Sequence, residues 1–392
     1  MKESDPASLQ SSILNPHSSI LNPDLLRQEL QRIPRLLLIR LRSLGDSILS
    51  LPLLESLHRW RPDLDLDVLS EAPFAAVFSN HPAVHETLIL RPRAWPGREG
   101  WTRTAVLKEI RRRRYPVVLN LHGGTTSMIF TLASGARLRI GQKNYRNVWA
   151  YNAQLPPSNE VWNRKDLHTV EHQMTLLRWA GIPVPLELEG RLHIEPKARA
   201  QAQERLQRSG IEPQKYVLVH PTATLFTKQW QEGNFAQLAD ELSGRFNLPV
   251  IFTSARNEER TLTRIASTAR RKHLYWSDLA LAELFAVIEG CSLFVGNDSG
   301  PAHAAAALKK PMVVVWGSSN SVAWHPWRTN YELVRSDFPC MPCPGYTCHA
   351  FGKPKCILDI PVDRVLLACE RILTSTCRGI APSMNEPTDE HR

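Results

Sequence analysis

The sequence predicts an α/β protein built from two doubly wound parallel-sheet domains, with one more helix at its C-terminal end. Short apolar runs alternate with helix-like stretches from Arg35 onward, and a second alternating series begins near Tyr216. Such alternation is typical of βαβ units and a parallel sheet. The 392 residues, 43% hydrophobic and 22% charged, are sufficient for two hydrophobic cores. We therefore expect Rossmann-like domains at 35–195 and 196–377, between a flexible leader at 1–34 and a flexible tail at 378–392.

Each predicted strand is a short apolar run. In the first half these runs lie at 36–40, 64–70, 86–90, 117–121 and 137–141, and in the second half at 216–220, 249–253, 274–276, 293–295 and 312–316. A loop rich in Asn, Trp and Pro is expected at 144–165, followed by a helix over 168–181 that ends at Gly181-Ile182-Pro183. Further helices are expected at about 233–245, 256–270, 279–289, 300–308 and 362–374. Two such sheets facing each other would bind ligands between them, beyond the carboxyl ends of their strands.

The two ends of the chain read as flexible. The leader repeats "SSILNP" at 11–16 and 18–23, without helical or strand periodicity, and the tail after Cys377 has a similar polar composition. No apolar run is long enough to span a bilayer, and the polar N-terminus does not resemble a secretory signal. We expect a cytoplasmic protein.

The charge indicates an anionic partner. The formal net charge is +10 and the pI is about 9.4. Nothing resembles an aromatic RNA-binding platform or a zinc-finger spacing, so nucleic acid is not expected. The densest basic run, "KEIRRRRY" at 108–115, reads either as the solvated face of a helix or as a patch for a membrane or an anionic acceptor. The sequence leaves these two interpretations open.

The first candidate for chemistry is Asp46, in "LLLIRLRSLGDSILSLPLLESL" at 36–57. Gly45 allows a tight turn after the strand, and Asp46 then lies near a helix N-terminus, where a carboxylate is stabilised. A plain N-cap would explain such an aspartate. However, no G-x-G-x-x-G follows this strand, and a carboxylate at the carboxyl end of a strand can accept a proton from a hydroxyl.

The second candidate is "VGNDSGPAHAAAALKKPMVVVWG" at 295–317. Asp298 ends a strand, Ser299 and Gly300 open a helix, and His303 falls in its first turn. Free amides at a helix N-terminus bind phosphate, to which His303 can also donate. The whole "NDSGPAH" set exceeds what a structural cap needs, and we therefore favour a phosphate-binding turn.

The third and fourth candidates lie after the first two strands of the second half. In "VLVHPTATLFTKQW", Thr222, Thr224 and Lys228 suit a diphosphate, unless Lys228 is a surface lysine, and Trp230 reads as a core anchor. In "FTSARNEERTL", Glu258 or Glu259 opens a helix where an acid can bind ribose hydroxyls, although a first-turn glutamate needs no function.

Four of the seven cysteines crowd into "CMPCPGYTCHAFGKPKC". They are Cys340, Cys343, Cys348 and Cys356, separated by two, four and seven residues. Thiolate pairs at short spacing can hold a structural zinc ion, but zinc ribbons usually separate two C-x-x-C hairpins more widely. We favour reduced thiols packed in a loop over a zinc site.

Together these segments resemble glycosyltransferase family 9, the ADP-heptose–lipopolysaccharide heptosyltransferases. The matching pieces are "LLLIRLRSLGDSILSLPLLESL", "HTVEHQMTLLRWAGIP", "VLVHPTATLFTKQW", "VGNDSGPAHAAAALKKPMVVVWG" and the cysteine loop, in the family's order over most of residues 35–375. The leader is outside the usual family domain. The donor sugar is not determined by any local motif.

The resemblance implies a GT-B fold, with an acceptor-binding N-terminal domain, a nucleotide-sugar-binding C-terminal domain and inverting transfer without a metal or other cofactor. Asp46 matches the catalytic base, Lys228 the lysine on the donor diphosphate, and Asp298 an aspartate near the donor sugar. Ser299, Gly300 and His303 match the phosphate-binding turn, and Glu258 is the expected ribose acid. Closure of the two domains would bring base and diphosphate together.

The implied partners are an ADP-sugar donor and a lipid-linked or lipopolysaccharide-core acceptor, with peripheral contact to the inner membrane and no nucleic acid. Two other functions remain open at this point: a nucleotide-sugar 2-epimerase of GT-B-like fold, and a non-catalytic nucleotide-sugar-binding protein. The missing glycine fingerprint disfavours a nicotinamide dehydrogenase.

Overall fold

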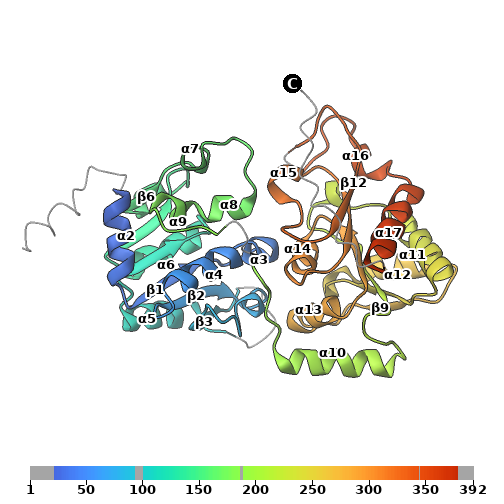
Figure 1. Ribbon diagram of the computed structural model, residues 1–392, viewed down its shortest axis with the longest axis horizontal. Helices are drawn as coiled ribbons and strands as arrows, with labels where there is room; N and C mark the ends of the chain where they lie inside the picture. Colours follow the sequence, from blue (N-terminus) through green and yellow to red (C-terminus); the bar gives the residue numbers. More distant parts are fainter. Residues whose placement is uncertain (1–21, 93–99, 186–188, 344, 378–392) are drawn as a thin grey trace, which may run out of the picture. The chain divides into compact units, whose positions relative to one another are not determined.

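The chain forms two compact units, each with its own parallel sheet (Figure 1). The computed structural model describes residues 22–92, 100–185, 189–343 and 345–377. Unit 1 comprises Met1–His193 and unit 2 comprises Ile194–Arg392. Each sheet has six strands, and every strand pairing within it is parallel. The described residues contain no helix long and apolar enough to cross a membrane.

The sheet of unit 1 has the strand order β3-β2-β1-β4-β5-β6. Its strands are β1 (Arg35–Ile39), β2 (Asp65–Glu71), β3 (Glu86–Leu90), β4 (Val117–Asn120), β5 (Leu138–Gln142) and β6 (Ala153–Leu155). The five predicted strands are all present, and β6 was not predicted. Successive strands are added on one side of β1 up to β3 and on its other side from β4 onward, so Leu38 of β1 pairs with both Val68 and Leu119. We call this place, where the strand order changes direction, the switch point of the sheet. In such sheets a ligand crevice lies at the carboxyl ends of the two strands there.

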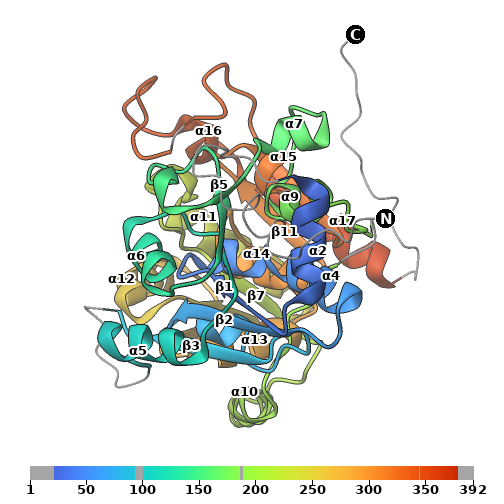
Figure 2. The ribbon, with the colours of Figure 1, turned by 90° about the vertical axis from the view of Figure 1, so that its left-hand side faces the viewer.

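Helices cover both faces of this sheet. They are α2 (Pro23–Arg32), α3 (Leu44–Ile48), α4 (Leu51–Trp60), α5 (Arg103–Arg113), α6 (Thr125–Ala133), α7 (Ser158–Trp162), α8 (Thr169–Gln173) and α9 (Thr175–Trp179), with the short 3₁₀ turns η1 (Ala75–Val77) and η2 (Val148–Ala150). In Figure 2, α5 and α6 lie on one side of the strands, and α2 and α4 lie on the other. One core cluster joins β-strand residues such as Leu37 and Val118 to Val106 and Phe130 on α5 and α6.

The prediction of a flexible leader over all of residues 1–34 is wrong for its last part. Residues 23–32 form α2, whose N-cap Asn22 accepts from the amide of Asp24 at 2.8 Å. Leu26 and Leu30, one helical turn apart, are buried in unit 1. Their i, i+4 spacing is the helical signal that the serine- and proline-rich repeat hid. Residues 1–21 and the expected tail at 378–392 lie outside the described residues.

Two other expectations for unit 1 need correction. The single helix expected over 168–181 is two short helices, α8 and α9, which meet at the buried Met174. The loop expected over 144–165 contains η2, β6 and α7.

The basic run of α5 is in part structural. Arg113 is largely buried and reaches three carboxylates, those of Asp67 at 2.9 Å, Glu86 at 2.7 Å and Glu109 at 2.7 Å. Tyr115 also donates to Asp67, and burial together with that bond raises the pKa of Tyr115 above its usual range. The exposed side chains of the run are those of Lys108, Arg111, Arg112 and Arg114. One cation of the run therefore serves the core, and the others remain on the surface.

Unit 2 repeats the same topology, with the strand order β12-β11-β10-β7-β8-β9. Its strands are β7 (Val217–His220), β8 (Val250–Thr253), β9 (Leu274–Trp276), β10 (Leu293–Asn297), β11 (Met312–Trp316) and β12 (Tyr331–Arg335). The five predicted strands are present, and the edge strand β12 was not predicted. The switch point of this sheet lies between β7 and β10, so a ligand is expected beyond their carboxyl ends, at His220 and Asn297.

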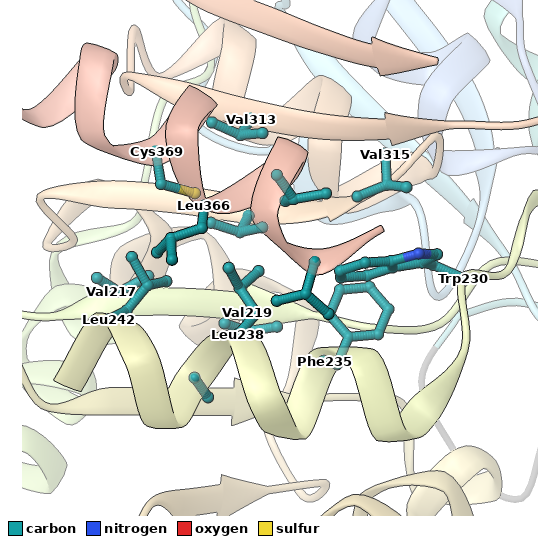
Figure 3. Close-up of a cluster of buried hydrophobic side chains, with 14 of the residues drawn as sticks. Val217, Val219, Trp230, Phe235, Leu238, Leu242, Val313, Val315, Leu366 and Cys369 are labelled. Carbon is teal, nitrogen blue, oxygen red and sulfur yellow. The ribbon is translucent and has the colours of Figure 1, made fainter. Parts of the chain in front are cut away.

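The described helices of unit 2 are α10 (Pro196–Arg208), α11 (Glu232–Phe246), α12 (Glu259–Thr268), α13 (Leu281–Glu289), α14 (Gly300–Ala307), α15 (Ser321–Trp324), α16 (Lys355–Leu358) and α17 (Val362–Cys377), with 3₁₀ turns η3 (Phe226–Lys228) and η4 (Arg256–Glu258). Five of these described helices, α11 to α14 and α17, were predicted, and α10, α15 and α16 were not. Figure 3 shows part of the core cluster to which α11, α17 and the central strands contribute.

Trp230 is the core anchor that the sequence predicted. Its ring is 2% exposed and packs edge-on against Phe235, with ring centroids 5.0 Å apart (Figure 3). The indole N–H donates to the carbonyl of Ile360 at 2.8 Å, and the backbone amide donates to Asn297 Oδ1 at 3.2 Å. The segment that precedes Trp230, including Lys228, is thereby attached to the core and to the end of β10.

Candidate active site

In unit 1, Asp46 lies at the switch point of the sheet, in the first turn of α3 directly after β1. The N-cap position is held by Ser43, whose hydroxyl donates to Asp46 Oδ2 at 3.0 Å instead of capping an amide. Gln173 donates to the backbone carbonyl of Asp46 at 3.3 Å. The Asp46 side chain is 30% exposed. The plain N-cap interpretation is therefore wrong, because this carboxylate caps nothing and remains accessible.

Two neighbours of Asp46 were missed by sequence reasoning. Arg40 Nη1 lies 3.7 Å from Asp46 Oδ1, and its side chain is only 8% exposed. His122, just beyond β4, places Nδ1 3.0 Å from the carbonyl oxygen of Arg42. Burial lowers the pKa of His122, and the charge of Arg40 lowers it further. The signal that could have found His122 is its place after the strand across the switch point from β1.

Tyr145 packs against the loop that follows β4. A Cβ added to Gly123, which has φ near +69°, would meet the Tyr145 ring at 2.8 Å, so only glycine fits between ring and loop. The Tyr145 hydroxyl donates to the carbonyl of Asn120 at 3.3 Å, and burial raises its pKa to about 12. It therefore stays neutral and serves as packing and as a hydrogen-bond donor.

In unit 2, Lys228 and Asp298 form an ion pair at the switch point. Lys228 Nζ lies 2.8 Å from Asp298 Oδ2, and the Asp298 side chain is only 4% exposed. Ser319 donates to the same oxygen at 2.5 Å, and His303 Nε2 lies 3.9 Å from Oδ1. An ammonium carries three donors, so Lys228 can keep Asp298 and still bind an anion. Ser319 was not predicted.

The start of α14 supplies fewer free amides than the sequence suggests. The amides of Ala302 and His303 already donate to the carbonyl of Ser299, at 3.1 and 3.3 Å. The donors left for an anion are those of Ser299 and Gly300. Within the described part of the chain, the Ser299 hydroxyl is buried and has no hydrogen-bond partner. A buried donor of this kind is expected to find a partner in a ligand.

Thr222 and Glu258 belong to a chain of hydrogen bonds behind the switch point. The Thr222 hydroxyl donates to Glu258 Oε2 at 2.8 Å, so its oxygen must accept from His220 Nε2 at 3.1 Å. His220 Nδ1 then accepts from the Thr253 hydroxyl at 3.3 Å. This order keeps His220 neutral and directs Glu258, which also accepts from the amide of Ala255 at 3.2 Å. Thr224 lies in the exposed loop beyond.

The neutral His220 makes stability depend on pH. Complete burial lowers its pKa to about 4, from 6.5 for a free side chain. Between these values the unfolded chain binds a proton that the folded chain excludes, so stability falls as pH falls. Between pH 7 and pH 5 we expect the free energy of unfolding of wild type to fall by about 2 kcal/mol more than that of His220→Gln. Urea unfolding of both proteins at the two pH values measures this difference, and equal losses would contradict it.

The cysteine loop is attached to the segment that carries Lys228. Thr227 shares a hydrogen bond with the Ser318 hydroxyl at 2.9 Å and donates to the carbonyl of Gly345. A Cβ on Gly317 would stand 2.3 Å from the carbonyl oxygen of Thr227, so backbone meets backbone here. The four cysteines of the loop, which line a common small hollow, are free thiols: Cys340, Cys343, Cys348 and Cys356. Within the described residues no group of three or more ligating side chains is arranged to hold a metal ion.

A separate polar cavity of about 440 Å³ lies within unit 1. Glu55 on α4 is central to it. Burial favours a higher pKa for this carboxyl, but the nearby His81, whose Nε2 lies 3.8 Å from Oε1, and hydrogen bonds from the amides of Arg191 and Gly190 lower it overall. None of the residues predicted from the sequence lines this cavity. It is therefore distinct from the Asp46 crevice.

Comparison with known proteins decides the family. The model of the family described as "Glycosyltransferase family 9 (heptosyltransferase)" matches residues 103–353, more than half of the chain. The chain belongs to glycosyltransferase family 9. A lipopolysaccharide heptosyltransferase 3 of Escherichia coli is 24% identical over 350 residues, which cover 86% of this chain and 98% of that protein.

Solved structures of family 9 share the fold. A family 9 glycosyltransferase from Veillonella parvula DSM 2008 superposes with a TM-score of 0.76 at 19% identity, covering 87% of this chain and 98% of its own. The ADP-heptose lipopolysaccharide heptosyltransferase II of E. coli gives 0.71 at 20% identity, covering 87% and 99%. Together with the two six-stranded parallel sheets, these matches confirm the predicted GT-B fold and the prediction of a glycosyltransferase.

Proposed function

We propose that this family 9 enzyme transfers heptose from ADP-heptose to the core of lipopolysaccharide, with inversion at the anomeric carbon and without a metal ion. The names of its relatives, one a lipopolysaccharide heptosyltransferase and another an ADP-heptose lipopolysaccharide heptosyltransferase, support the substrates. The observation that carries the proposal is that the two switch points hold complementary groups, a base at one and anion-binding donors at the other. An accessible carboxylate lies at one, and a lysine with a helix N-terminus lies at the other.

Asp46 acts as the general base in this proposal. An acceptor hydroxyl attacks the anomeric carbon of the donor, and a bond forms between its oxygen and that carbon. The bond from the same carbon to the diphosphate oxygen breaks on the opposite face, which inverts the centre. The hydroxyl proton passes to Asp46, which Ser43 orients by a 3.0 Å hydrogen bond.

The donor side stabilises the negative charge that grows on the departing ADP. Lys228 offers the N–H donors that Asp298 leaves over, and the buried Ser299 hydroxyl offers a donor without another partner in the described chain. Gly300 adds the first amide of α14, and His303 lies in the same turn. A lysine and a helix N-terminus are sufficient cationic groups for such a site, which is why we propose transfer without a metal.

Glu258 is proposed to bind the ribose. Both of its hydrogen bonds to the chain fall on Oε2, which leaves Oε1 for a sugar hydroxyl. Thr222, whose hydroxyl is already used, holds Glu258 in this role. The exposed Thr224 is free to meet the diphosphate, and Asp298, held by Lys228, is assigned to the donor sugar rather than to the departing ADP.

We assign the acceptor to unit 1 and the nucleotide sugar to unit 2. A lipopolysaccharide core is carried on lipid, so we also place the enzyme in the cytoplasm, in peripheral contact with the inner membrane. The surface cations of the α5 run, Lys108, Arg111 and Arg114 among them, would favour such an anionic surface.

The test is release of ADP from ADP-heptose by the purified chain, with and without a heptose-deficient lipopolysaccharide core as acceptor. We expect ADP release to depend on the acceptor and to keep its rate when a chelator is added. The anomeric configuration of the transferred heptose should be opposite to that in ADP-heptose. Release of equal rate without acceptor would instead indicate hydrolysis or epimerisation. The stabilising effects of ADP-, GDP- and UDP-sugars on the thermal midpoint would identify the nucleotide independently.

A further inference from the structure

Arg40 is a buried cation whose hydrogen bonds are incomplete. It directly follows β1, and its side chain is 8% exposed. Its Nη1 lies 3.7 Å from Asp46 Oδ1, beyond the length of a good hydrogen bond. Within the described residues its Nε is buried and has no hydrogen-bond partner. Burying a guanidinium is costly, and a cation buried for stability normally has its donors satisfied.

Arg113 in the same unit shows what a satisfied buried arginine looks like. Its side chain is 10% exposed, and it contacts three carboxylates, all within 2.9 Å. Arg40 is buried to the same degree, yet it has one carboxylate partner, at a longer distance. Stability alone does not account for this arrangement. A buried cation left underused beside an accessible acid is typical of a functional site.

The charge of Arg40 acts on more than one group of the crevice. Burial lowers the pKa of His122, and the charges of Arg40 and Arg42 lower it further, so this imidazole is neutral near pH 7. The carbonyl of Arg42 can only accept, so His122 Nδ1 carries the proton and Nε2 keeps its lone pair. Tyr145, within reach of the same charge, stays neutral. The charge of Arg40 therefore reaches His122 and Tyr145 as well as Asp46.

We infer that Arg40 is a positioning residue for Asp46, and that it holds this carboxylate in place. This inference rests on the proposed function, in which Asp46 is the base. A carboxylate and an imidazole nitrogen with a lone pair would then both face the acceptor hydroxyl, and neither would compete by donating to it. Arg40 itself touches no reacting atom in this scheme.

The inference is tested by Arg40→Met and Arg40→Lys in the full chain, with Arg35→Met as the control. Arg35 lies at the other end of β1 and makes a half-exposed contact of 3.4 Å to Asp65. Misplacing a base by about 1 Å can cost about 100-fold in rate. We expect kcat to fall about 100-fold in Arg40→Met, to recover to within about tenfold of wild type in Arg40→Lys, and to be unchanged in Arg35→Met. The KM for ADP-heptose should remain that of wild type in all three.

Two further readouts separate positioning from a general effect on folding. NMR titration of His122 should show a higher pKa in Arg40→Met than in wild type or Arg35→Met, because the lost cation no longer opposes protonation. In the background of Asp46→Asn, Arg40→Met should lower the residual rate by less than about threefold, since partners in one function are not additive. If Arg40→Met does not fold, the cycle of Arg40→Lys with Asp46→Asn tests the same coupling.

Three results would overturn the inference. They are a wild-type kcat in Arg40→Met, the same loss in Arg40→Lys as in Arg40→Met, and an equal proportional loss with and without Asp46. The failure of the proposed function looks different. In that case wild type itself would show no acceptor-dependent transfer, whereas the His122 titration would still report whether Arg40 controls the crevice.

Discussion

Replacing Asp46 by asparagine lowers kcat for heptose transfer by about 1,000-fold, while affinity for ADP-heptose stays that of wild type. General-base catalysis contributes about 100- to 10,000-fold, and an amide cannot take the proton that the acceptor hydroxyl loses. We expect donor affinity to be unaffected because the proposed donor residues all belong to unit 2. The substitution keeps the shape of the side chain, and Ser43 can still donate to the remaining oxygen.

Single-turnover transfer and titration of ADP-heptose measure the two quantities separately. The matched control is Asp65→Asn, which removes a half-exposed carboxylate at the amino-terminal end of β2, at the end of the sheet opposite to Asp46. It should transfer heptose at the wild-type rate. A rate for Asp46→Asn within about threefold of wild type would remove Asp46 from the proposed mechanism.

Replacing Lys228 by alanine weakens ADP-heptose binding by about 100-fold and lowers kcat as well. Hydrogen bonds to charged groups contribute about 1.5–3 kcal/mol, and the loss leaves the buried Asp298 without its cation. That carboxylate would then repel the diphosphate. The double variant Lys228→Ala/Asp298→Asn should therefore bind ADP more tightly than Lys228→Ala alone.

Calorimetric titration of ADP, together with steady-state transfer, tests both expectations. Lys215→Ala is the control, because Lys215 is exposed and pairs with Glu212 at 2.7 Å before β7 begins. It should bind ADP as wild type does. Unchanged ADP affinity in Lys228→Ala would exclude this lysine from the diphosphate site. A double variant no better than the single one would show that Asp298 does not repel the ligand.

The sequence was sufficient for all the central strands and for two of the four edge strands, β3 and β9. Central strands of a parallel sheet are buried on both faces, so they appear as continuous apolar runs, as β10 and β11 do. The missed strands, β6 and β12, are at sheet edges. Ala153–Leu155 is only three residues long, and Tyr331–Arg335 mixes polar and apolar residues because it is half exposed. Neither could be distinguished from a loop by its pattern.

Site residues could be predicted where their position directly after a predicted strand is enough to place them. Asp46 and Ser299 follow strands that the sequence located, so their place at a carboxyl edge could be inferred. Pairings between distant residues could not. His122 meets the carbonyl of Arg42 across 80 positions, and Lys228 meets Asp298 across 70 positions. Local propensity carries no information about such contacts, which depend on strand order and on helix packing.

Lys228 also lies two residues before Trp230, which is fixed in the core of unit 2 by burial and by hydrogen bonds. The ring of Trp230 is buried, its indole N–H is bonded, and its amide is bonded to Asn297. Asn297 in turn donates to the carbonyl of Pro221 at 2.7 Å, which ties the ends of β7 and β10 together. Under the proposed function, an incoming nucleotide would therefore meet a binding site that is already assembled, and little of its binding energy would be lost to ordering the protein. Sugar nucleotides that share the diphosphate should consequently compete on the fit of base and sugar alone.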